Sequence, residues 1–130
     1  MTMPNDALRN RYLADAVATA SPARLLVMLY DRLVLDLARG EQALRDGDRG
    51  AASQQLLHAQ DIVLELRASL DTDAWEGGPG LARLYEFVMT ELIQANVRRD
   101  ADRVAGCRAL MEPLRDAWRE AAATTAASAA

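Results

Sequence analysis

Four stretches of this chain carry apolar residues at every third or fourth position, and short connections join one stretch to the next. Steps of three and four place side chains on one face of an α-helix, so each stretch predicts an amphipathic helix. The expected helices span about 21–45, 48–70, 79–98 and 100–122. Because short connections favour antiparallel neighbours, we expect an all-α fold, an antiparallel up-down four-helix bundle.

Residues at the ends of these stretches agree with the helix limits. Ser21 followed by Pro22 is typical of a helix start, and Asp48 suits the same role for the second helix. Gly47 tolerates the left-handed conformation that ends many helices. Asp100 or Asp102 is the expected cap of the fourth helix. We therefore divide the chain into a leader (1–20), a bundle (21–122) and an Ala-rich tail (123–130) that we expect to be disordered or frayed.

Composition and charge exclude several classes of function. The net charge is −4, all the basic residues are Arg, and they alternate with acidic residues, which argues against nucleic-acid binding. No apolar run approaches the roughly 20 residues of a membrane span, so we expect no membrane insertion. The first ten residues lack the pattern of a secretory signal. The cytoplasm is therefore the expected location.

The sequence shows no gathering of catalytic or metal-ligating residues. It holds one His and one Cys, which is too few for the clusters that zinc and di-metal sites need. We expect His58 to lie in solvent without a partner, on the side of its helix with Asp61 and Glu65. Cys107 falls on an apolar stripe and is expected to be a small buried residue. We predict no enzyme activity, no metal and no cofactor.

Several helices carry more apolar surface than one buried face requires. Met28 and Leu35 lie opposite the core stripe of the first helix. At 100° per residue, the second and third helices also have outward lines. A wide core or self-association would explain these lines, and so would a groove that receives an amphipathic helix from a partner. The outward lines are Leu57, Leu64 and Ala68 on the second helix, and Ala82, Met89, Ile93 and Val97 on the third.

A distinctive series of residues begins before the first helix and recurs along the chain. In order, these residues are Tyr12, Thr19-Ala20-Ser21-Pro22, Leu25 to Asp31, Leu66, Leu70-Asp71, Leu81, Leu84-Tyr85 and Leu114 to Trp118. The series resembles the family of the flagellar secretion chaperone FliS, over about residues 12–121. One departure is Arg32, where we would expect a small residue.

The resemblance implies a four-helix bundle whose leader acts as a cap, with Leu8, Tyr12 and Leu13 as its apolar residues. It implies binding of the C-terminal region of flagellin in the cytoplasm, which prevents premature polymerisation, and delivery to the flagellar type III export apparatus. Export gate components are possible further partners, and no cofactor is implied. The expected groove consists of Leu57, Leu64, Ala68, Met89, Ile93 and Val97.

Two other functions remain open from the sequence. In the first, the protein is an adaptor bundle for a different partner. In the second, it is a self-associating structural bundle, and the outward lines are contacts between copies. We expect a monomer or a weak homodimer.

Overall fold

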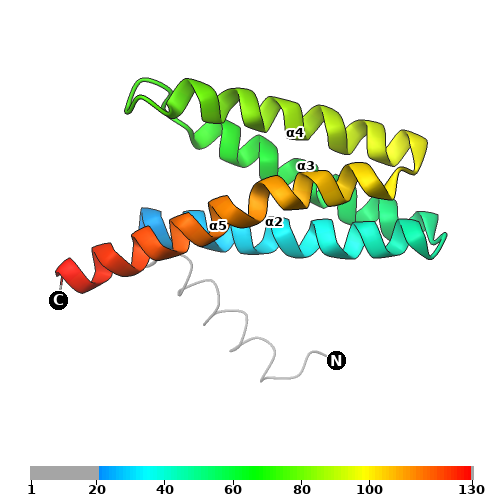
Figure 1. Ribbon diagram of the computed structural model, residues 1–130, viewed down its shortest axis with the longest axis horizontal. Coiled ribbons are helices and arrows are strands. Elements are labelled where there is room, and N and C mark those ends of the chain that lie inside the picture. Colours follow the sequence, from blue (N-terminus) through cyan, green and yellow to red (C-terminus); the bar gives the residue numbers. More distant parts are fainter. Residues whose placement is uncertain (1–20, 130) are drawn as a thin grey trace, which may run out of the picture.

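The structure is a computed structural model, and it describes residues 21–129. These residues form α2 (Pro22–Arg45), α3 (Arg49–Ser69), α4 (Gly78–Arg98) and α5 (Ala101–Ala129). Each helix packs antiparallel to the one before it, and α5 returns to lie along α2 (Figure 1). The predicted all-α four-helix bundle is confirmed. The expected cap residues Leu8, Tyr12 and Leu13 lie outside the described residues.

The helix starts follow the capping residues that the sequence indicated. Ser21 Oγ accepts a hydrogen bond from the Arg24 amide at 3.2 Å, and Asp48 Oδ1 accepts one from the Ala51 amide at 3.1 Å. Asp100 Oδ1 accepts from the amides of Asp102 and Arg103, at 3.1 and 3.2 Å. These side chains satisfy backbone donors that have no partner inside the helix. The limits of α2, α3 and α4 therefore fall within one or two residues of those expected.

The last helix is longer than the sequence analysis indicated. We expected it to end near residue 122, but α5 continues through Ala129 and passes Pro113 without interruption. Alanine has the highest intrinsic helix propensity, which accounts for the continuation into the Ala-rich tail. An ion pair between Arg119 and Asp31, at 2.7 Å, ties this half of α5 to α2.

The core lies along the axis of the bundle and is built from the predicted stripes. Tyr30 and Leu37 of α2, Leu56 of α3 and Val88 of α4 are all buried. Cys107 is buried as expected, and α5 also contributes Val104 and Met111. Ala121, near the expected end of the fourth helix, is exposed. None of the described helices is long and apolar enough to cross a membrane.

Candidate partner-binding surface

The outward line of α3 is exposed. Leu57 and Leu64 keep 51% and 58% of their surface accessible, and Ala68 is exposed as well. The opposite side of the same helix buries Leu56, Ala59 and Val63 in the core. α3 therefore has apolar residues on two faces, of which the core uses one.

The outward line of α4 is exposed over most of its length. Ile93 and Val97 keep 43% and 74% of their surface accessible, and Met89 is half-buried against the core. Ala82, which we also expected in this line, is buried. It lies one turn after Gly78, where the α3–α4 connection packs so closely that a Cβ would come within 2.5 Å of the Thr72 carbonyl oxygen. The expectation for Ala82 was therefore wrong, because the connection covers that end of α4.

Polar contacts fix how α3 and α4 lie against each other. The Asn96 amide is 3.4 Å from Ser53 Oγ, and Arg67 Nε is 3.6 Å from Glu86 Oε1. With the helices antiparallel, this register sets Leu57 at the level of Ile93 and Leu64 at the level of Met89. Leu64 and Met89 line the same hollow, of about 270 Å³. We call the six residues Leu57, Leu64, Ala68, Met89, Ile93 and Val97 the α3/α4 surface.

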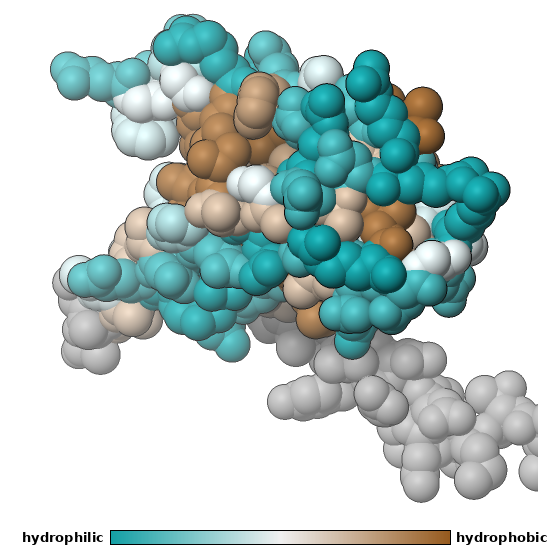
Figure 2. Space-filling model, turned by 45° about the vertical axis from the view of Figure 1, so that its right-hand side comes forward, coloured by the Kyte–Doolittle hydropathy of each residue, from teal (hydrophilic) through white to brown (hydrophobic). Residues whose placement is uncertain are grey.

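A second apolar hollow lies between α4 and α5, and the sequence analysis missed it. Its volume is about 510 Å³, and Phe87 and Leu110 are its exposed apolar residues. Arg103 crosses it, with its guanidinium 3.1 Å from Glu91 Oε2 and 3.1 Å from Asp100 Oδ2. On the face that Figure 2 presents, apolar residues form separate patches among charged side chains. Exposed apolar residues thus occur at both helix pairs, α3 with α4 and α4 with α5.

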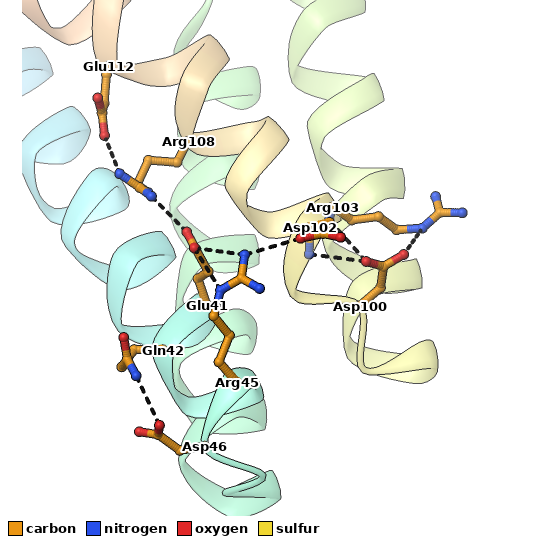
Figure 3. Close-up of polar contacts among 9 residues, drawn as sticks. All are labelled: Glu41, Gln42, Arg45, Asp46, Asp100, Asp102, Arg103, Arg108 and Glu112. Atoms are coloured by element: carbon orange, nitrogen blue, oxygen red, sulfur yellow. Dashed lines mark hydrogen bonds and ion pairs between the residues drawn. The ribbon is translucent and has the colours of Figure 1, made fainter.

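The contact between α2 and α5 is polar at its outer edge (Figure 3). Glu41 accepts hydrogen bonds from Arg108 at 2.8 Å and from Arg45 at 3.1 Å, and Arg45 also reaches Asp102 at 3.2 Å. The hydrogen bond from Arg108 lowers the pKa of Glu41 below its ordinary value. Each of these charged side chains has an oppositely charged partner, so this edge joins α2 to α5. It offers little apolar contact area to another protein.

An aromatic cluster closes the end of the bundle where α2 begins. The hydroxyls of Tyr30 and Tyr85 lie 2.6 Å apart, and the ring of Trp118 packs between those of Tyr30 and Trp75. Burial raises the pKa of both tyrosines, and the hydrogen bond between the two hydroxyls raises the pKa of Tyr85 further. Both hydroxyls therefore stay protonated at neutral pH, which fits a packing role rather than proton transfer.

His58 lies at the surface as expected, but the expectation that it has no partner was wrong. Its side chain is half exposed, but its Nδ1 is hydrogen-bonded to Oδ2 of Asp36, a carboxylate of α2 that is completely buried. Arg32 Nε lies 3.0 Å from the other carboxylate oxygen. The sequence analysis did not single out Asp36, because a charged residue among the apolar residues of a helix is normally assigned to the side that faces solvent.

The described residues hold no group of three or more His, Cys, Asp or Glu side chains placed to bind a metal. Burial raises the pKa of the Cys107 thiol to about 12, so it is protonated at neutral pH. The exposed residues of the α3/α4 surface offer apolar contact area.

Comparison with known proteins identifies the family. A family model described as flagellar protein FliS matches residues 4–125. The chain belongs to the FliS family. It is 30% identical over 118 residues to the flagellar secretion chaperone FliS of Bacillus subtilis (strain 168), and the match covers 88% of this chain and 88% of that one. It is 34% identical over 108 residues to the flagellar secretion chaperone FliS of Escherichia coli (strain K12), covering 82% of this chain and 79% of that one.

The FliS family assignment agrees with the fold. A crystal structure of a flagellar chaperone from bacteria superposes with a TM-score of 0.73 at 20% sequence identity, over 93% of this chain and 99% of that chain. The resemblance that began at Tyr12 and Ser21-Pro22 is therefore confirmed for nearly the whole chain.

Proposed function

We propose that this protein is a cytoplasmic chaperone that binds the C-terminal region of flagellin. In this role it prevents premature polymerisation and delivers flagellin to the flagellar type III export apparatus, whose gate components are possible further partners. The observation that carries the proposal is the exposed α3/α4 surface in a member of a family whose relatives are named flagellar secretion chaperones.

The physical basis is the burial of apolar side chains on both partners. An amphipathic helix laid along α3 and α4 would cover Leu57, Leu64, Ile93 and Val97, which are otherwise in water. Each such side chain contributes roughly 1.5–3 kcal/mol when fully buried, before the cost of ordering the bound segment. Half-buried Met89 adapts its shape readily, which suits a surface that receives a flexible partner. Such a complex is stable enough to shield the client and still separates at export.

The test is titration calorimetry with a peptide from the C-terminal region of flagellin of the same organism. We expect one-to-one binding to the parent protein, and a loss of affinity of about tenfold or more in Leu64→Asp and in Ile93→Asp. Both residues are exposed, so neither charge has to be accommodated in the core. Leu110→Asp is the matched control, because Leu110 is an exposed apolar residue of the other hollow.

The outcomes separate the function from the site. Binding that is lost in Leu110→Asp and kept in Leu64→Asp and Ile93→Asp would retain the function and move the site to α4 and α5. Absence of binding to any flagellin segment would reject the chaperone function. Light scattering at several protein concentrations tests the competing possibility that the α3/α4 surface joins two copies of this chain.

We further propose that the leader, 1–20, acts as a cap that competes with flagellin. Its apolar residues Leu8, Tyr12 and Leu13 are followed by only a short tether to Ser21, the cap of α2. A fully extended chain spans about 3.3–3.6 Å per residue, so Leu13 reaches roughly 25 Å from Ser21. The Ala68 end of the α3/α4 surface lies toward the same end of the bundle as the start of α2.

Deletion of residues 1–17 tests the cap. Competition with flagellin predicts an affinity for the flagellin peptide about three- to tenfold higher in the truncated protein, because binding no longer has to displace the leader. Circular dichroism serves as the control for the fold. Unchanged affinity in a truncated protein that remains folded would show that the leader does not compete for this surface.

A further inference from the structure

We propose that the hydrogen bond between Asp36 and His58 sets the position of α3 along α2. The two residues are 22 positions apart in the sequence and come from different helices. The inference concerns the fold and does not depend on the proposed function, although Leu57 of the α3/α4 surface precedes His58 directly.

Apolar packing alone leaves the relative position of these helices weakly determined. The residues that α2 and α3 bury against each other and in the shared core are mostly Leu, Val, Ile and Ala. Apolar contacts have no preferred direction, and a helix displaced along its neighbour by one turn presents similar side chains to the same partner. The short α2–α3 connection, 46–48, limits movement at one end of the pair, where the Asp48 amide donates to the Ala43 carbonyl oxygen at 2.9 Å. Farther along the helices, a directional contact is needed to favour one arrangement.

Asp36 supplies this direction. It is the only charged side chain that is buried among the described residues, with 0% of its surface accessible. Its Oδ2 accepts the hydrogen bond from His58 Nδ1, whereas Oδ1 accepts no hydrogen bond from the described residues and lies 3.0 Å from Arg32 Nε of its own helix as an ion pair. His58 therefore provides the one hydrogen bond that the buried carboxylate receives from a side chain of another helix. If α3 moved along α2, this carboxylate would remain buried and lose that bond, which is strongly unfavourable.

The two helices also pack closely beside this pair. One turn beyond Asp36 is Gly40, where a Cβ atom would come within 2.9 Å of Leu56 Cδ2. Leu56 is two residues before His58, so steric fit and the polar contact act within one turn of each helix. His58 lies half exposed at the edge of the contact, which leaves Asp36 as the group that bears most of the cost of burial.

The experiment measures the distance between α2 and α3 directly. Spin labels are placed in the full-length chain at Arg39→Cys and Asp61→Cys, which are exposed, in a Cys107→Ala background. The parent should give one narrow distance distribution by double electron–electron resonance. Asp36→Leu combined with His58→Leu removes the bond without leaving a buried charge. We expect a second population in this variant, shifted by about 5 Å, which corresponds to one helical turn.

Asp36→Asn is the matched control, because the Asn carbonyl oxygen still accepts from His58 and should keep the distribution narrow. If the leucine pair overfills the contact and the helical signal is lost, Asp36→Ala with His58→Ala replaces it, since smaller side chains cannot overpack. A single narrow distance in a folded variant that lacks both polar groups would overturn the proposal. So would a distribution that broadens equally in Asp36→Asn.

Discussion

At the scale of single residues, Cys107 shows how the bundle controls the chemistry of a side chain. It is the only cysteine of the chain and lies on the inner face of α5, beside the hollow that Phe87 and Leu110 line. Burial raises the pKa of its thiol to about 12, so almost none of it is thiolate at pH 8. The thiolate is the reactive form of cysteine, and the folded protein therefore keeps this residue inert.

We expect Cys107 to react with Ellman's reagent at pH 8 on the order of 100-fold more slowly in the folded protein than in concentrated urea. Unfolding removes both the burial and the shift of the pKa, so the unfolded rate is the internal control. The absorbance of the released thiolate measures both rates. Similar rates in buffer and in urea would contradict the burial of this residue.

The pairing of Asp36 with His58 shows why some residues escaped prediction from the sequence. Periodicity assigns each residue to the inner or outer side of its own helix, and it predicted Cys107 as a buried residue correctly. A polar residue at the edge of a stripe is assigned to solvent by the same rule. Asp36 breaks the rule because its partner comes from another helix, which a pattern within one helix does not reveal.

At the scale of helices, α5 is joined to α2 by charges as well as by the core. Glu41 of α2 lies between Arg45 of its own helix and Arg108 of α5 (Figure 3). The hydrogen bond from Arg108 lowers the pKa of Glu41, so the folded state favours the ionised form. This contribution is fully present above the unfolded pKa of about 4.5 and is lost as the pH falls through the lower folded value.

Glu41→Gln should therefore lower the free energy of unfolding at pH 7 by about 1 kcal/mol, the upper part of the range for partly exposed ion pairs. The difference from the parent should shrink as the pH falls below about 4.5, because protonation of Glu41 in the unfolded parent removes the advantage of its ionised folded form. Urea unfolding at pH 7 and at pH 3 measures this. Glu120→Gln is the control, because the Glu120 side chain forms no ion pair within residues 21–129. A difference that stays constant down to pH 3 would contradict the account.

Helix limits were predictable where a local capping residue sets them. Ser21, Asp48 and Asp100 act through hydrogen bonds to amides two or three residues later, so their effect is visible in the sequence. The end of α5 has no such residue, and the Ala-rich sequence there supports helix without a defined stop. The expected end near residue 122 therefore rested only on the Ala-rich composition of the tail, because no capping residue marks a helix end there.

At the scale of the whole molecule, exposed apolar residues gather on two helix pairs, α3 with α4 and α4 with α5, while Met28 and Leu35 lie apart from them on α2. The α3/α4 surface arises from lines of residues along single helices, which is why periodicity predicted Leu57, Leu64 and Ile93 as exposed. The hollow between α4 and α5 combines Phe87 of one helix with Leu110 of another. Surfaces of this second kind depend on tertiary packing and were not predictable from the sequence.

The most direct test of the central claim observes the surface itself during binding. Methyl groups of Leu, Ile, Val and Met are labelled in the full-length protein, and their resonances are followed by nuclear magnetic resonance as an unlabelled peptide from the C-terminal region of flagellin is added. The account predicts that Leu64, Met89 and Ile93 shift, and that Leu35 of α2 and Leu110 of α5 do not. Shifts confined to Leu35 or Leu110, with Leu64, Met89 and Ile93 unchanged at saturation, would contradict the claim that α3 and α4 bind the client.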